Sequence, residues 1–311
     1  MSDAAPSPAR PTPPPAADAE VGAAGLVAHR YAFAEPDPAH TAAVAAARAR
    51  SGRAGPGVIE QMLAHRSCRR YTGEPVDDAL LDVLLAAAFS APSKSDLQQC
   101  SVIVVDDPGR RQAVAELIPT MPWILDCGRF LLFCADSRRI RRVADRAGVP
   151  FANDHLDAVL NAAADAAIHL ASFIWAAESV GLGTCPISVV RNHIEAVAAI
   201  VELPEQVFPL AGMCVGWPER LLPFSPRLPP AVTVHRDRYR ADDGAEAEAV
   251  DGYSRRRSAA GRPVPPDQQL DVDIWGVADP YGWAEEKARM VARRERDQLA
   301  RFLGGQGFGL G

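Results

Sequence analysis

The most constraining feature of the sequence is a long apolar stretch, residues 153–180, whose pattern predicts one helix. Apolar residues recur there mostly three or four positions apart, and Gly181 follows as a C-terminal stop. The positions with this spacing are Leu156, Val159, Leu160, Ala163, Ala167, Leu170, Ile174 and Ala177. The remaining face is also largely alanine. A helix that is apolar nearly all round has to be buried, either in the protein core or against a second subunit.

The bulk composition sets the size and the environment of the fold. The chain has 311 residues and is 48% hydrophobic, which is enough for one sizeable globular domain or two small ones. Its net charge of −6 gives no global attraction to nucleic acid or to an anionic membrane surface, so we expect neither partner. No uninterrupted apolar run approaches the roughly 20 residues that span a bilayer, and no signal-peptide pattern opens the chain. We therefore expect a soluble, cytoplasmic protein.

The cysteine and histidine spacings argue against a metal site. The six cysteines form no Cys-x-x-Cys pair, and no histidine lies at zinc-finger spacing from them. Because most of them lie inside apolar runs, we expect buried, reduced thiols rather than a disulfide framework. His155, His169 and His193 are each isolated from potential co-ligands, so we expect helix-surface or core histidines.

The chain divides into two parts by composition. Residues 1–56 are rich in alanine, proline and glycine, which predicts a mostly disordered arm, although 41–50 could form a short helix. The arm is either an inert extension or a partner-binding segment. Residues 57–311 have globular patterning and form the second part.

Helices and strands alternate through the globular part. The run "DALLDVLLAAAF" (78–89) predicts an amphipathic helix with an N-cap. Continuous apolar runs predict buried strands at 101–107, 129–136 and 208–217. A variable stretch follows near 241–270, and the final unit, 281–310, reads as one charged helix that ends at glycine.

Three segments that are far apart in the sequence offer cations and hydroxyl groups. Arg66, Ser67 and Arg69 lie in "HRSCRRYTGEPV", Ser93 to Ser95 lie at a helix-to-strand break, and Arg227 lies in "SPRLP". Arginine binds phosphate bidentately and serine hydroxyls complete the oxygen shell, so the three segments together could hold one phosphate. Each of these residues alone would be an ordinary surface residue.

Six blocks give the sequence a specific resemblance. "HRSCRRYTGEPV", "APSKSDLQQCSVIVV", "ESVGLGTCPI", "LPEQVFPLAGMCVGWPE", "PRLPPAVTVH" and "GW…FLGGQGF" occur in the order seen in the nitroreductase and flavin reductase family. The resemblance covers about residues 57–311. It implies an α+β fold with a central, mainly antiparallel sheet flanked by helices, and a C-terminal segment that is swapped across a homodimer. It also implies flavin mononucleotide (FMN) as cofactor, NADPH or NADH as electron donor, and a small-molecule electron acceptor.

The resemblance also assigns roles to the opening stretch. His65, Arg66, Ser67 and Arg69 match its FMN-binding residues, with Arg66 on the phosphate and Arg69 near the flavin N1 and O2 edge. Reduced flavin carries negative charge around N1 and O2, so a guanidinium there would favour hydride acceptance. Arg70 is expected to be a solvated neighbour.

The other implied contacts come from three later segments. Ser93, Lys94, Ser95 and Asp96 fall on a loop that usually reaches the flavin of the other subunit. Pro186, Ile187 and Ser188 match a segment whose backbone meets the flavin ring, and Arg227 matches a phosphate-binding arginine.

The sequence departs from the family pattern at several of these positions. Lys94 and Asp96 stand where neutral residues are common, and Ser188 stands where glycine is usual. Ser225 replaces a lysine, for which Lys94 could compensate, and Met121 replaces a glutamine that contacts the ring.

The resemblance implies ping-pong reduction of nitro compounds, quinones or free flavins, with no side-chain general acid. A non-catalytic flavin-binding or interaction protein is the rival hypothesis, and a dehalogenase or flavin-fragmenting enzyme on the same fold is a third. A hydrolase centred on Cys214 in "GMCVG" is disfavoured because that run is an apolar strand.

Overall fold

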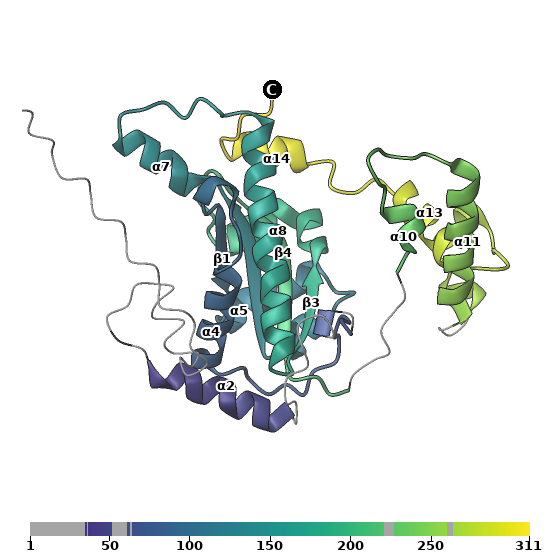
Figure 1. The fold of residues 1–311 in the computed structure, drawn as a ribbon, viewed down its shortest axis with the longest axis horizontal. Helices are drawn as coiled ribbons and strands as arrows, with labels where there is room; N and C mark the ends of the chain where they lie inside the picture. The colour runs from purple at the N-terminus through teal and green to yellow at the C-terminus, as the bar shows by residue number, and fades with distance from the viewer. Residues whose placement is uncertain (1–34, 36, 52–60, 63, 221–226, 260–263) are drawn as a thin grey trace, which may run out of the picture.

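The computed structural model describes residues 35, 37–51, 61–62, 64–220, 227–259 and 264–311. Most of the predicted arm, residues 1–34, 36 and 52–56, lies outside the described residues, as does Ser225. The remainder contains an antiparallel sheet with helices on both faces and a helical excursion beside it (Figure 1).

The sheet has four strands in the order β1-β2-β4-β3, and every neighbouring pair is antiparallel. The strands are β1 (Cys100–Val104), β2 (Arg129–Asp136), β3 (Gly183–Ile187) and β4 (Val207–Gly216). The central strands β2 and β4 are almost fully buried, which explains why their apolar runs are continuous rather than alternating. The predicted α+β class and antiparallel sheet are therefore confirmed.

Strand β2 supplies alternate side chains to two separate hydrophobic clusters. Leu131 and Phe133 face the cluster that includes α4 (Asp78–Phe89) and α8 (Leu156–Ser179). Phe130 and Leu132 face the second cluster, which lies on the opposite face. That face carries three shorter helices, α5 (Pro108–Leu117), α6 (Trp123–Asp126) and α9 (Ile194–Ile200). The two cores follow from the period of two in a pleated strand.

Helix α8 confirms the helix predicted from the long apolar stretch. His155 is its N-cap and accepts a hydrogen bond from the Asp157 N–H group. By length and composition α8 could cross a membrane, which corrects the expectation that the chain holds no such segment. Its inner face packs on β2 and α4, as in a core helix, while Leu156 and Leu160 are more than half exposed.

Helix α2 (Pro38–Ser51) confirms the short helix predicted over 41–50 and places it on the domain. It packs against α4, and its Ala47 is buried in the same cluster as α8. The Arg50 guanidinium forms a bidentate ion pair with Glu74 and lies 4.3 Å from the Trp217 ring centroid. Residues 38–51 therefore form a helix that packs on the domain.

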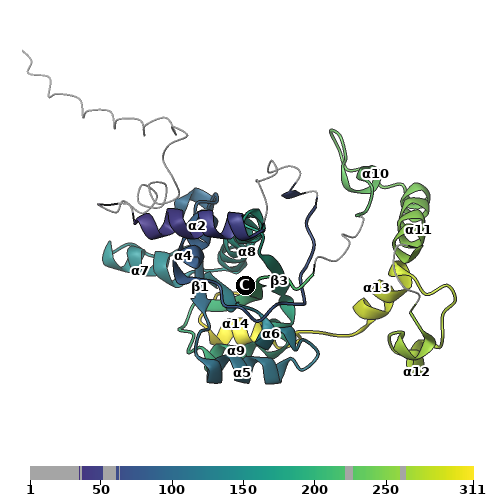
Figure 2. The ribbon, with the colours of Figure 1, turned by 90° about the horizontal axis from the view of Figure 1, so that it is seen from below.

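A helical excursion follows the sheet. It contains α10 (Pro230–Thr233), α11 (Asp243–Ala259), α12 (Val272–Trp275) and α13 (Trp283–Ala292). Both ribbon views show these helices to one side of the sheet, and α14 (Leu299–Gly305) then returns to it beside α9 (Figures 1 and 2). The stretch near 241–270 thus includes a helix.

The final unit is two helices, not the single charged helix predicted. The helical pattern stops at Ala292, and Arg296 has a φ of +59°, which an α-helix does not allow. Residues 293–298 contain no apolar residue, so polar contacts with distant residues, such as those of Arg296 with Ser188 and Asn192, hold this segment.

The packing of α8 on β2 leads to a prediction about stability. Phe173 on α8 is fully buried and meets Phe133 edge-on at 5.7 Å between ring centroids. Phe173→Ala should lower the free energy of unfolding by about 3–5 kcal/mol, measured by urea denaturation. The control, Val149→Ala at a valine that is 53% exposed, should change it by less than about 0.5 kcal/mol. Equal losses in the two variants would contradict this packing.

Candidate functional site

The opening stretch runs along the outer edge of β3. Ser67 forms a β-bridge with Thr184, and the Cys68 N–H group donates to the Thr184 carbonyl at 2.7 Å. The Tyr71 hydroxyl donates to the Cys68 carbonyl at 2.7 Å. Burial raises the pKa of Tyr71 far above its usual value, so the hydroxyl stays protonated and remains a donor. These bonds fix the backbone from which residues 65–69 project.

The His65 side chain is committed to a carboxylate on α8. Its Nδ1 lies 2.7 Å from Oε1 of Glu178, and the Thr184 hydroxyl donates to the same oxygen at 3.3 Å. The Trp175 ring packs edge-on against His65 at 5.2 Å between centroids. Glu178 therefore joins α8, β3 and the opening stretch at one point.

The polar side chains of the opening stretch lie in two environments. Arg66 and Ser67 are half-buried, and Arg66 Nε donates to the Ala64 carbonyl at 3.0 Å. Arg69 is exposed, with its guanidinium 5.8 Å from the Trp123 ring centroid. Burial raises the pKa of the Cys68 thiol, and the nearby charge of Arg69 opposes that rise. The stretch thus presents a local positive charge on a chain of net charge −6.

The next predicted segment lies at the end of β3, beside the opening stretch. Pro186 and Ser188 are exposed, whereas Ile187 is buried in the core. Proline is tolerated in β3 because this is an edge strand. The structure therefore brings residues 65–69 and 186–188 together.

Arg296, which the sequence interpretation missed, reaches this segment from the C-terminal part of the chain. Its Nη2 donates to the Ser188 hydroxyl at 3.3 Å and its Nε donates to Asn192 Oδ1 at 2.9 Å. In the sequence Arg296 is one of several charged residues in "ARRERDQ", and nothing there distinguishes it from its neighbours.

The loop that holds Ser93, Lys94, Ser95 and Asp96 is fixed by a buried carboxylate. Asp165 on α8 is 1% exposed and accepts from Ser93 Oγ at 2.8 Å, Lys94 N at 3.0 Å and Gln99 N at 2.9 Å. Lys94, Ser95 and Asp96 are exposed. Within the described residues Lys94 forms no ion pair with Asp96, whose Oδ1 instead accepts from Gln98 Nε2. Asp165 was also missed in the sequence.

Within one subunit this loop and the opening stretch lie far apart. The loop precedes β1 at one edge of the sheet, and the opening stretch borders β3 at the other edge. Their anchors on α8, Asp165 and Glu178, are separated by 13 residues, which is roughly 20 Å along a helix. A single copy of the chain therefore does not bring both groups to one small ligand.

Arg227 lies three residues before α10, and its side chain is exposed. It belongs to the segment that leads into the excursion.

The cysteines are buried, as their positions in apolar runs predicted. All six cysteines are free and buried. His169 is buried and bonded to the Asp165 carbonyl at 2.6 Å, and His155 caps α8. Across the described residues no group of three or more potential ligands could hold a metal ion.

The α+β fold, with a cationic stretch along the edge strand β3, matches one family of known proteins. The profile of the nitroreductase family matches residues 62–217, and the profile of that family's C-terminal domain matches residues 225–311. The chain belongs to the nitroreductase family.

Individual relatives agree with this placement. The chain is 40% identical over 189 residues to "FMN reductase [NAD(P)H]" of Bacillus subtilis, covering 60% of this chain and 76% of that one. The structure of B. megaterium NfrA2 is 32% identical with a TM-score of 0.73, covering 82% and 98% of the two chains. A Vibrio harveyi NADPH:FMN oxidoreductase complexed with NAD+ is 28% identical with a TM-score of 0.69, covering 81% and 98%.

The buried carboxylate makes the first prediction for this site. Asp165→Asn replaces an acceptor by an amide group that faces N–H and O–H donors, so it should destabilise the protein by about 1–3 kcal/mol. It should also speed hydrogen exchange at the Lys94 and Gln99 amides. Asp96→Asn, at an exposed aspartate on the same loop, is the control and should leave both quantities nearly unchanged. Unaltered exchange in Asp165→Asn would contradict the anchoring role.

The contact between the opening stretch and β3 makes the second prediction. A Cβ atom at Gly183 would lie 2.6 Å from the Cys68 Cβ, so Gly183→Ala has to displace residues 65–69 from β3. The sheet itself should survive, because Gly183 is at the start of an edge strand. We expect far-UV circular dichroism to stay native while any ligand of the opening stretch binds weakly. Normal ligand binding in Gly183→Ala would contradict this geometry.

Proposed function

We propose that the protein is an FMN-dependent NAD(P)H oxidoreductase that reduces a small-molecule electron acceptor. The observation that carries the proposal is the positive opening stretch, with Arg66, Ser67 and Arg69 set along β3 beside Pro186 and Ser188 in a nitroreductase-family chain. Relatives named FMN reductase and NADPH-flavin oxidoreductase support this choice of cofactor and donor.

The residues present fit FMN by their chemistry. A phosphate monoester needs arginine forks and hydroxyl donors, which Arg66 and Ser67 supply. The flavin N1 and O2 edge needs a cation, and the exposed guanidinium of Arg69 has no carboxylate partner among the described residues. Of the nearby carboxylates, Glu178 is already bonded to His65 and Thr184.

In this proposal the chain orients the reactants and stabilises charge. FMN, when bound, supplies the hydride chemistry between the nicotinamide and the acceptor. Arg69 stabilises negative charge at the flavin edge, and Arg66 and Ser67 hold the phosphate. Arg296 holds Ser188 and Asn192 in place after the end of β3. Alternating use of donor and acceptor at one site would give ping-pong kinetics with nitro compounds, quinones or free flavins.

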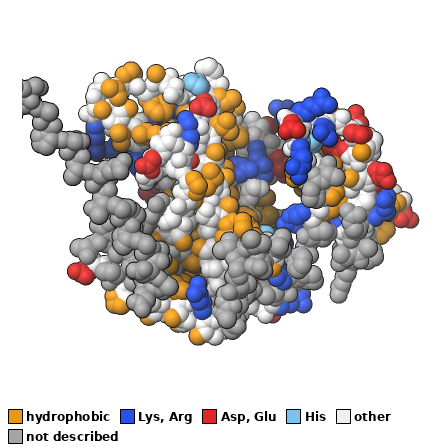
Figure 3. Space-filling view, in the orientation of Figure 1, with side chains coloured by type: hydrophobic (Ala, Val, Ile, Leu, Met, Phe, Trp, Pro, Cys, Tyr) orange, Lys and Arg blue, Asp and Glu red, His pale blue; other side chains and the backbone are white. Residues whose placement is uncertain are grey.

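A homodimer would complete this site. The Ser93–Asp96 loop is too far from the opening stretch of its own subunit, so in our proposal it serves the site of the other subunit. The outer face of α8 offers a surface for pairing, because Leu156 is 60% exposed and Leu160 is 64% exposed. Figure 3 shows hydrophobic side chains gathered over the central part of the molecule, where α8 lies in Figure 1. A monomer would leave this apolar face in water.

The excursion offers a second surface for the partner. Ile274, Trp275 and Val277 are each more than half exposed on a segment that stands away from the sheet. We propose that this segment, and Arg227 at its start, lies on the other subunit. A cytoplasmic location is also proposed, because the cysteines are all free thiols.

The visible spectrum of the purified protein tests the function. Under anaerobic conditions, bound flavin should lose its yellow absorbance on addition of NADPH or NADH, added separately to find the preferred donor. A flavin that stays oxidised with both donors would favour the rival hypothesis of a non-catalytic flavin-binding protein. Failure to bind FMN at all would remove the site assignment.

The role of Arg69 makes a separate prediction. Arg69→Ala should slow flavin reduction by about 10- to 100-fold, because the developing negative charge loses its cation. FMN affinity should change much less, because Arg66 and Ser67 remain. Stopped-flow absorbance measures the rate, and Arg70→Ala, at the exposed neighbour, is the matched control. Equal rates in Arg69→Ala and Arg70→Ala would remove the proposed role.

A further inference from the structure

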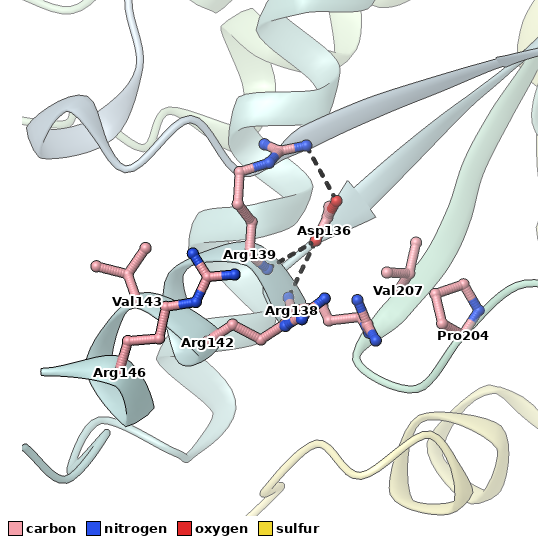
Figure 4. Close-up of a pocket in the computed structure, with 8 residues that line it drawn as sticks. All are labelled: Asp136, Arg138, Arg139, Arg142, Val143, Arg146, Pro204 and Val207. Atoms are coloured by element: carbon pink, nitrogen blue, oxygen red, sulfur yellow. Dashed lines mark hydrogen bonds and ion pairs between the residues drawn. The ribbon is translucent and has the colours of Figure 1, made fainter. Parts of the chain in front are cut away.

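A second cluster of cations lies in a cavity at the other end of the sheet. The cavity has a volume of about 290 Å³ and lies between helix α7 (Arg138–Arg146) and the chain that leads into β4. Figure 4 shows Arg138, Arg139, Arg142 and Arg146 around it, with Asp136 as the one carboxylate of the lining. Asp136 pairs with Val207 at the end of β2, whereas Ser67 of the opening stretch pairs with Thr184, which lies opposite Val215. The positions of Val207 and Val215 on β4 are roughly 26 Å apart, so this cavity is separate from the opening stretch.

The carboxylate in the cavity is already satisfied. Asp136 Oδ1 accepts from the N–H groups of Arg138 and Arg139, and its Oδ2 accepts from Ser101 Oγ at 2.5 Å and Arg139 Nη2 at 3.2 Å. The charge of Arg139 is therefore balanced by Asp136. Ser101 and Gln98 occupy other hydrogen-bond donors of the same guanidinium.

The other three arginines of the lining have no such partner. Across the part of the chain that the structure describes, no carboxylate lies within ion-pair distance of Arg138, Arg142 or Arg146. They are four residues apart, which places them on one side of α7, and Figure 4 shows Arg138 extending toward Pro204 and Val207. The remaining arginine of this part of α7, Arg141, points inward and is paired with Asp154 at 2.6 Å.

The spacing of the three arginines places like charges next to one another along α7. Like charges four residues apart repel, and Arg138, the first residue of α7, lies at the positive N-terminal end of the helix dipole. Arg146 lies in the last turn, where the dipole favours a cation. The first turn of α7 holds no acidic residue, and Asp136, which precedes the helix and accepts from its first N–H groups, is the one carboxylate at this end in the cavity lining. A bound anion would offset both the repulsion between the arginines and the unfavourable position of Arg138 at the N-terminal end of the helix.

We propose that this cavity is a binding site for a compact anion that carries a diphosphate group. Guanidinium groups bind phosphate oxygens bidentately, and three uncompensated cations match the charge of a diphosphate. The volume is at the lower end of the range for small-molecule sites, which suits a diphosphate group better than a large ligand. Pro204, Val143 and Val207 give the cavity one apolar wall, which accommodates an organic substituent on the phosphate.

The test uses the full-length protein saturated with FMN, so that the FMN phosphate site is occupied. Isothermal titration with inorganic pyrophosphate at about 0.15 M salt, where exposed charges are screened, measures the affinity. The triple variant Arg138→Gln, Arg142→Gln, Arg146→Gln should bind pyrophosphate at least about tenfold more weakly. The matched control changes Arg236, Arg238 and Arg240 to Gln. These three are exposed on the excursion and do not line the α7 cavity, so the control should bind like the unmodified protein.

A thermal unfolding experiment gives an independent readout. Pyrophosphate should raise the melting temperature of the unmodified protein and of the control, but not that of the α7 variant. Without anion the α7 variant should be at least as stable as the unmodified protein, because it has lost the repulsion. A titration with ADP in place of pyrophosphate distinguishes an organic diphosphate from inorganic pyrophosphate as the ligand. Tighter binding of ADP identifies an organic diphosphate. Equal pyrophosphate affinity in the α7 variant and the control would overturn the proposal.

Discussion

Helix α8 is the element on which the site depends, because its two buried or half-buried carboxylates each fix a different part of it. Asp165 holds the Ser93–Gln99 loop through three donors, and Glu178 holds His65 and Thr184. The rigid helix between them sets their separation at roughly 20 Å. The inner face of the same helix packs on β2, so the spacing of the two groups is fixed by the hydrophobic core.

The elements that the sequence predicts correctly are those whose pattern is local. The strands β2 and β4 are continuous apolar runs, and α8 shows helical spacing over its full length. The excursion has no such signal, because it is held by contacts between distant residues. Tyr253 packs edge-on against Trp283, the Ala284 N–H group donates to Ser254 Oγ, and Arg289 is buried and donates to the Leu270 carbonyl. The break between α13 and α14 depends in the same way on the Arg296 contacts with Ser188 and Asn192.

The candidate site, like the fold, could be predicted from the sequence only in part. The cations and hydroxyls of residues 65–69 stand out because they are clustered, whereas the pairing of Ser67 with Thr184 on β3 is a tertiary feature that no local pattern shows. The carboxylates that position them do not stand out, since each is a single acid in an alanine-rich helix. The sequence indicates them only indirectly. An acid on a largely apolar helix needs a hydrogen-bond partner, and the neighbouring sequence does not contain one. The identity of that partner is a property of the tertiary fold.

The position of the opening stretch along β3 has a consequence for solubility. An edge strand with free N–H and C=O groups can pair with other chains and initiate aggregation. Here the backbone at Ser67 and Cys68 occupies the Thr184 region of that edge, and Pro186 removes one donor further along. The segment that presents the cations is therefore also a cover for the sheet. A substitution that detached it would produce a chain prone to self-association, so the residues of the candidate site also protect the fold.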